Sequence, residues 1–150
     1  MVKEFCKAWE ANKGNLEEYF RTHTQDNYDS YDALVKLLFD IVINPSMKSD
    51  YYRFRTDDMT VLDHGEWQGT LIFILHMNCY QPSVDEYVYT SMGYGSCSGC
   101  DTLQGIHNYG TELPSEQQIK DYMTLCLHLL QRCNYMVHGE EDSDERKTES

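Results

Sequence analysis

The chain has 150 residues and a formal net charge of −13 at pH 7. This length suits one domain with a hydrophobic core of its own. The negative charge disfavours nucleic acid and anionic membranes as direct partners, because binding phosphates requires Lys and Arg. It favours the basic surfaces of other proteins, although negative charge also simply keeps a small protein soluble.

Neither a secretory signal nor a membrane-spanning segment is visible in the sequence. The first residues lack the apolar core of a signal peptide, and no run approaches the roughly 18 apolar residues that cross a bilayer. We therefore expect a cytoplasmic protein whose six cysteines are reduced.

Helices are expected in the N-terminal third of the chain. Apolar residues recur at near-helical spacing over residues 5–20, and Gly14 should break or bend this segment. A second apolar stripe covers residues 31–42. The boundaries of this second helix are predicted from two capping candidates and one proline: Asp29, Ser30 and Pro45.

The sequence pattern in the middle of the chain predicts an antiparallel β-meander. The continuous apolar run within residues 68–76 predicts a central strand covered on both faces, and residues 87–94 are rich in strand-forming residues. A weak edge strand, a β-prone stretch and a turn are predicted at residues 51–55, 59–62 and 63–66.

A long C-terminal helix is the clearest predicted element. Ser115 and Gln118 fit a capping box, the apolar stripe extends to Val137, and Gly139 should end the helix. Cys126 and Cys133 lie on that stripe and should belong to the core. Residues 139–150 contain no apolar side chain and should form an acidic, disordered tail, which leaves residues 1–138 as one domain. The predicted fold is α+β: N-terminal helices, a three- or four-stranded antiparallel meander, and the C-terminal helix packed on the sheet.

The segment from Gly95 to Thr102 carries the chemically most suggestive motif, Cys97-x-x-Cys100. Three interpretations stay open. The thiols could form half of a zinc site, completed by further ligands among His76, Cys79 and His107. They could act as a redox dithiol. The interpretation we favour is a tight loop that shapes a binding surface, with Asp101 capping a short helix.

The expected binding surface combines this loop with tyrosines, which offer large contact area and a polar tip. No Lys or Arg lies between Arg55 and Lys120, so a phosphate site is not expected, and no catalytic residue or cofactor is predicted apart from the zinc alternative. The predicted binding residues are Tyr80, Gln81, Tyr94, Ser96, Cys97, Ser98, Cys100, Asp101 and Thr102.

Residues 55–133 resemble a group of small accessory proteins of tailed bacteriophages and prophages. The resemblance rests on Asp63, Gln68-Gly69-Thr70, Tyr80-Gln81-Pro82-Ser83, Gly95–Leu103, Pro114-Ser115-Glu116, Asp121-Tyr122-Met123 and Leu127-His128-Leu129-Leu130. It implies a phage-encoded accessory protein in the host cytoplasm and transfers no catalytic residue.

Charge and resemblance together lead to one functional hypothesis. We expect a protein that binds a basic surface on a host protein and modulates or inhibits it, as an anti-defence protein or an inhibitor of a nucleic-acid enzyme would. The alternatives are a thiol-based redox or other enzyme centred on Cys97 and Cys100, and a small structural zinc module. The oligomeric state stays open.

Overall fold

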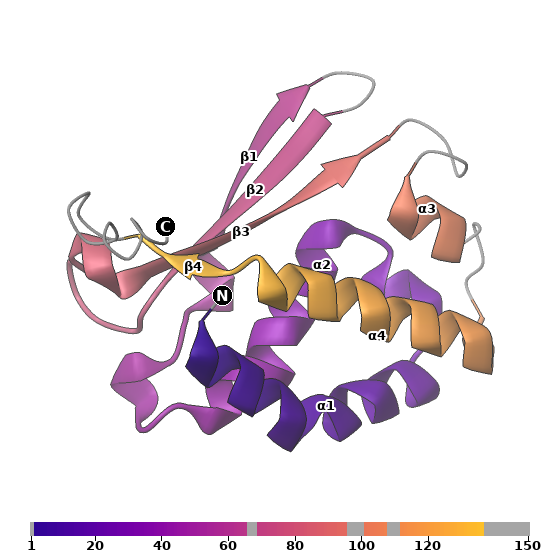
Figure 1. The fold of residues 1–150 in the computed structure, drawn as a ribbon, viewed down its shortest axis with the longest axis horizontal. Helices are drawn as coiled ribbons and strands as arrows, with labels where there is room; N and C mark the ends of the chain where they lie inside the picture. Colours follow the sequence, from indigo (N-terminus) through magenta and orange to yellow (C-terminus); the bar gives the residue numbers. More distant parts are fainter. Residues whose placement is uncertain (1, 66–68, 96–100, 108–111, 137–150) are drawn as a thin grey trace.

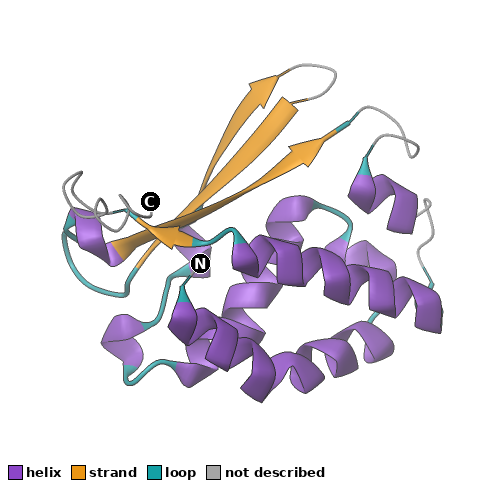
Figure 2. Cartoon of the chain, in the orientation of Figure 1, coloured by secondary structure: helices purple, strands orange, loops and turns teal. Residues whose placement is uncertain are grey.

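The chain forms a layer of helices packed against one antiparallel sheet (Figures 1 and 2). The computed structural model describes residues 2–65, 69–95, 101–107 and 112–136. Helices precede and follow the strands in the sequence, and the last helix packs on the sheet. This arrangement confirms the α+β class predicted from the sequence.

Helix α1 (Lys3–Thr22) runs without interruption through Gly14, so the predicted break does not occur. Gly14 is exposed, and a Cβ atom built there would meet nothing within 4 Å. Packing therefore makes no demand on the backbone at this position. The helix is held on both sides of the glycine by fully buried side chains, including Phe5 and Phe20.

Helix α2 (Tyr31–Leu37) begins where the sequence predicted, with Ser30 as its N-cap. The Ser30 hydroxyl accepts a hydrogen bond from the Ala33 amide at 3.3 Å. The helix then widens into the π-helical turn η2 (Leu38–Ile43) and tightens into the 3₁₀ turn η3 (Asn44–Ser46), which contains Pro45. The buried side chains of η2 pack against α1, so the irregular turn belongs to the core.

Residues 51–55 do not form the edge strand that was predicted. The 3₁₀ turn η4 (Asp50–Tyr52) includes the first two residues of this segment, and a single bridge joins Phe54 to Met77. The Asn44 side chain contacts both main-chain polar groups of Phe54: its Oδ1 accepts from the amide at 2.8 Å and its Nδ2 donates to the carbonyl at 2.9 Å. The main chain of residues 53 and 55 bonds to residues 76 and 78, and the Asn44 side chain serves the polar groups of Phe54 that point away from them. Further 3₁₀ turns are η1 (Gln25–Tyr28), η5 (Thr56–Asp58) and η6 (Val84–Glu86).

Four strands make the sheet, in the spatial order β1-β2-β3-β4 with every neighbouring pair antiparallel. Strands β2 and β3 pair along their whole length, from Gly69 opposite Tyr94 to His76 opposite Tyr87. Asp63 to Gly65, predicted as part of a turn, belong to the first strand instead. The strands are β1 (Thr60–Gly65), β2 (Gly69–His76), β3 (Tyr87–Tyr94) and β4 (Asn134–Tyr135).

The helices cover one face of the sheet, whereas the apolar run in β2 predicted cover on both faces. Phe73 and Leu75 of β2 are fully buried, but Ile72 and Ile74, which point to the opposite face, are partly exposed. Burial alternates in the same way along β3. The prediction fails because the described residues supply no second helical layer for the other face.

Helix α4 (Glu116–Gln131) starts with the predicted capping box of Ser115 and Gln118. It ends at Gln131, before the predicted stop, and the chain turns back to add β4 to the sheet. This turn brings Tyr135 beside Val88 in the sheet and within 6.0 Å of the Phe5 ring, centroid to centroid. Tertiary contacts therefore outweigh the helical periodicity that continues to Val137. Residues 137–150, including the predicted tail, lie outside the described part.

Candidate functional site

The predicted binding residues fall at two opposite ends of the sheet. Tyr80 and Gln81 follow β2, whereas Tyr94, Asp101 and Thr102 lie at or beyond the far end of β3. The eight-residue pairing between them corresponds to about 23 Å. Tyr80 is 90% exposed, and Gln81 adopts a positive φ of 57°. The two groups therefore do not form one continuous patch. Ser96, Cys97, Ser98 and Cys100 lie outside the described residues.

The proposed zinc ligands are divided in the same way. His76 and Cys79 lie at the end of the sheet opposite Gly95 and Asp101, the described residues that flank the Cys97-x-x-Cys100 motif. His107, at the end of the short helix α3 (Thr102–His107), is on the motif's side. Within the described ranges, no group of three or more His, Cys, Asp or Glu residues is placed to hold a metal ion.

Asp101 is the best-connected of the predicted site residues. Its carboxylate is buried, with 6% relative exposure. One oxygen accepts from the Tyr31 hydroxyl at 2.8 Å and from the Gln104 amide at 3.1 Å, and the other accepts from the Gly95 amide at 2.8 Å. The Gln104 contact is the predicted N-cap of α3. Asp101 thus joins the end of β3, the start of α2 and the start of α3.

Tyr31 is the hydrogen-bond partner of Asp101 on α2, and we call these two residues with their hydrogen bonds the Asp101 anchor. The Tyr31 hydroxyl donates to Asp101 and accepts from the Leu103 amide at 3.0 Å, and burial raises the pKa of this phenol. These hydrogen bonds of Asp101 and Tyr31 all run to other described residues of the chain, as expected for a group that fixes a loop in place. A hollow of about 320 Å³ opens beside it, with the carboxylates of Asp29, Asp32 and Asp63 among its lining residues.

Three of the described thiols, those of Cys79, Cys126 and Cys133, lack the features of reactive cysteines. Burial raises the pKa of Cys126 and of Cys133 to about 12, and both side chains belong to the core, as predicted. Burial also raises the pKa of Cys79, and its sulfur lies 3.6 Å from the Glu86 carboxylate. A raised pKa opposes the thiolate, which is the form that attacks substrates and binds metals.

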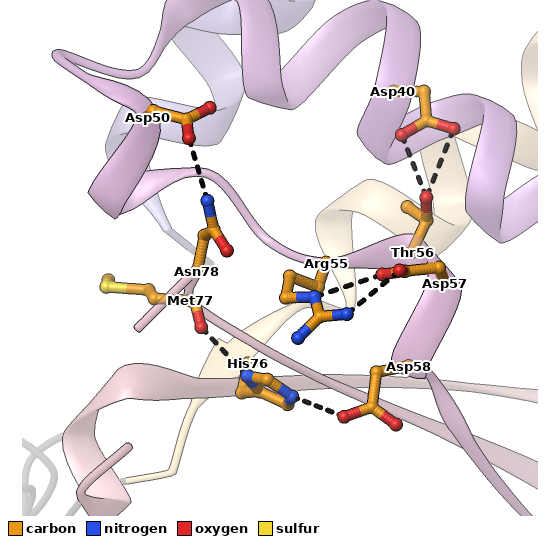
Figure 3. A network of polar contacts seen from close by, with 9 residues as sticks. All are labelled: Asp40, Asp50, Arg55, Thr56, Asp57, Asp58, His76, Met77 and Asn78. Atoms are coloured by element: carbon orange, nitrogen blue, oxygen red, sulfur yellow. Dashed lines mark hydrogen bonds and ion pairs between the residues drawn. The ribbon is translucent and has the colours of Figure 1, made fainter. Parts of the chain in front are cut away.

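A polar network at the β2 end of the sheet was not predicted from the sequence (Figure 3). The His76 ring lies between two oxygen acceptors, the Met77 carbonyl and the Asp58 carboxylate, each at 2.8 Å from a ring nitrogen. On the same segment, the Asn78 amide group donates to Asp50 at 2.8 Å. The partners are up to 28 residues apart in sequence, so no local pattern reveals them.

Arg55 lies in the same network but is already paired. Its guanidinium donates to both oxygens of Asp57, at 3.1 and 2.9 Å, and this hydrogen bonding lowers the pKa of the Asp57 carboxyl (Figure 3). Thr56 donates to Asp40, whose pKa is nevertheless raised by burial. The network is therefore a set of internal contacts that fasten residues 50–58 to β2 and the helical layer.

Charged side chains are distributed unevenly between the sheet layer and the helical layer. Residues 56–119 contain no Lys or Arg, and their described part holds β1, β2 and β3. Asp57, Asp58, Asp63 and Asp85 are exposed along these strands and their connections. The cations of the described chain belong mainly to the helical layer and its connections. Residues 56–119 thus contribute negative charge and no cation to the sheet layer, and the cation that contacts β3 among the described residues is Arg132, which donates to the Ser91 carbonyl at 3.3 Å.

In the described ranges, no helix is long and apolar enough to cross a membrane. Comparison of the chain with protein-family models, with curated proteins and with solved structures finds no match.

Proposed function

We propose that this protein binds a basic surface on another protein through its acidic sheet layer, and thereby modulates or inhibits that partner. The observation that carries the proposal is the absence of Lys and Arg from residues 56–119, together with the exposed carboxylate of Asp63 on β1 and those of Asp57, Asp58 and Asp85 in the turns beside the strands. Clustered charge of one sign raises the association rate with a partner of opposite sign.

The internal contacts of the candidate site support binding over catalysis. Asp101, Tyr31 and His76 are all occupied by hydrogen bonds that hold the fold together. Cys79, Cys126 and Cys133 have raised pKa values, which oppose nucleophilic or redox chemistry. The resemblance of residues 55–133 to phage accessory proteins supports a host protein as the partner, with inhibition of a nucleic-acid enzyme as the effect.

Affinity capture with two matched variants tests this proposal. The immobilised protein is exposed to a bacterial lysate, and captured proteins are eluted with rising salt. One variant neutralises the sheet layer: Asp57→Asn, Asp58→Asn and Asp63→Asn. The control neutralises the helical layer by the same charge: Glu10→Gln, Glu18→Gln and Asp26→Asn. All six carboxylates are exposed, and Asn keeps an oxygen that accepts the hydrogen bonds now made to Asp57, Asp58 and Asp63, so both variants should fold.

We expect a basic partner that is retained by the wild type and by the helical variant and is lost from the sheet variant. Elution should begin as salt rises above about 0.1 M, where the screening length is about 10 Å. Equal retention by both variants, or capture that does not depend on salt, contradicts the proposal.

A further inference from the structure

We propose that the outer edge of β1 receives an extended basic segment of the partner as an additional strand of the sheet. This inference rests on the proposed function and specifies where and how the partner binds. β1 is the first strand in the order β1-β2-β3-β4, so β2 pairs with one of its edges. Within the described residues, the main-chain hydrogen bonds of β1 run to β2 only.

The open edge has the length and regularity that strand addition requires. β1 pairs with β2 without a bulge, from Thr60 opposite Ile74 to Gly65 opposite Gly69. Its six residues extend over about 20 Å. On the edge that faces away from β2, every second residue directs its N–H and C=O outward, and no described residue outside β2 bonds to the main chain of β1.

The features that usually protect an edge strand are largely missing from β1. Natural edges carry Pro or charged side chains, above all Lys, are interrupted by bulges, or are covered by another element. The charged side chain of Asp63 is the one such feature within β1, and its negative charge is compatible with a basic strand. β1 contains neither Lys nor Pro, and all six of its residues are exposed. Val61 and Leu62 are each 42% exposed. The other edge strand, β4, has only two residues, so it offers little template for pairing.

The charge around β1 decides which strand it accepts. Asp63 lies within β1 and accepts from the Tyr94 hydroxyl at 2.6 Å. Asp57 and Asp58, shortly before β1, are also exposed and contact Arg55 and His76. A second copy of this chain would bring the same carboxylates to the edge, and the net charge of −13 adds repulsion between copies. Lys and Arg on the incoming strand remove this repulsion. The occupant that fits is therefore an extended segment in which basic and apolar side chains alternate.

β1 is held ready for such a partner by the rest of the fold. β2 is paired along its length with β3, and β3 is fastened to the helical layer through the Thr90 hydroxyl, which donates to the Leu129 carbonyl at 2.7 Å. Phe73 and Leu75 anchor β2 in the core. Binding thus needs little rearrangement of the sheet, which limits the free-energy cost of ordering.

Two fluorescent peptides of equal charge test the inference. The first is Lys-Val-Lys-Val-Lys-Val-Lys; the second has the same sequence with all internal amides N-methylated, so it keeps its side chains and loses its main-chain donors. We expect binding of the first peptide at low ionic strength, near 10 mM, and at least tenfold weaker binding of the second. Leu62→Lys should weaken binding of the first peptide at least fivefold. Leu113→Lys adds the same charge at an exposed site, 52% accessible, away from β1, and should change it less than twofold.

The possible outcomes separate the inference from the proposed function. Equal binding of the two peptides, or equal effects of the two lysine variants, overturns strand addition but leaves an acidic binding surface intact. Failure of both peptides to bind at low ionic strength overturns the strand addition and the electrostatic proposal together.

Discussion

The helical layer and the sheet layer of this protein differ in both packing and charge. The helical layer contains most of the fully buried side chains, including the mutually contacting rings of Phe20, Tyr28 and Tyr122. The sheet layer buries side chains on one face only, and its edge strand β1 is exposed throughout. Stability is therefore concentrated in one layer, which leaves the other free to present main chain and carboxylates to a partner.

The largest effect is expected in the helical core. Phe20 is fully buried, with its ring centroid 4.8 Å from that of Tyr28 and 5.3 Å from that of Tyr122. Phe20→Ala should lower the free energy of unfolding by about 3–5 kcal/mol, because it removes a large buried ring and leaves a cavity. Leu62→Ala in β1 should lower it by about 0.5 kcal/mol. Urea unfolding followed by circular dichroism measures both, and similar costs would contradict the contrast between the layers.

The Asp101 anchor links the two layers, and its removal should cause the second-largest loss in the free energy of unfolding. Asp101→Ala leaves the Gly95 and Gln104 amides and the Tyr31 hydroxyl without their acceptor. The expected loss is about 2–3 kcal/mol, because buried donors lose their partners. Thr102→Ala is the matched control, since this exposed neighbour should change stability by no more than about 0.5 kcal/mol. Comparable losses in the two variants would show that the anchor has no special role.

The buried thiols should make the protein sensitive to high pH. Burial raises the pKa of Cys126 in the folded state to about 12, above the value near 8.5 for an unfolded chain. Below pH 8.5 both states keep the proton, so stability is unaffected. Between these two pKa values only the unfolded state releases it, so the free energy of unfolding falls as pH rises.

The thiol contribution should be about 1 kcal/mol per pH unit for each cysteine. Urea unfolding at pH 8, 9 and 10 should therefore show a shallower decline for Cys126→Ala than for the wild type. Cys79, which is only partly buried, should react with a thiol reagent well before Cys126 and Cys133 do. An identical pH slope in the variant would contradict the burial of Cys126 as the cause.

Alanine substitutions at two glycines should change stability in opposite directions, and the gain at Gly14 is the smallest effect predicted. Gly14 of α1 has open space around it, so Gly14→Ala should stabilise the protein by about 0.5–1 kcal/mol through higher helix propensity. A Cβ at Gly69 would lie 2.1 Å from the His64 carbonyl oxygen, where β1 meets β2. Gly69→Ala should therefore destabilise by about 1–3 kcal/mol. Thermal unfolding distinguishes these opposite signs, and destabilisation by Gly14→Ala would show that α1 is not continuous there.

Local signals in the sequence predicted much of the fold. The caps at Ser30 and Ser115 act through their immediate neighbours, and the strands at residues 69–76 and 87–94 have strong β-forming composition. The errors involve long-range contacts. The Asn44 side chain bonds to the main-chain polar groups of Phe54, and Tyr135 rejoins the sheet although helical periodicity continues beyond α4.

Less of the candidate site than of the fold could be predicted from the sequence. The N-cap role of Asp101 follows from its neighbours, but its contact with Tyr31 joins residues 70 positions apart. The exposure of β1 depends on which strand lies beside it, and composition alone does not determine that order. The lack of Lys and Arg over residues 56–119 is visible in the sequence itself, without knowledge of the structure.

Amide hydrogen exchange, with and without the unmethylated basic peptide, tests the central claim most directly. The account predicts that amides of Thr60–Gly65 on the edge facing away from β2 exchange quickly in the free protein and slow at least tenfold in the complex. Amides of the exposed surfaces of α1 and α4 should not change. Binding that protects the helical layer and leaves β1 unchanged would contradict the account.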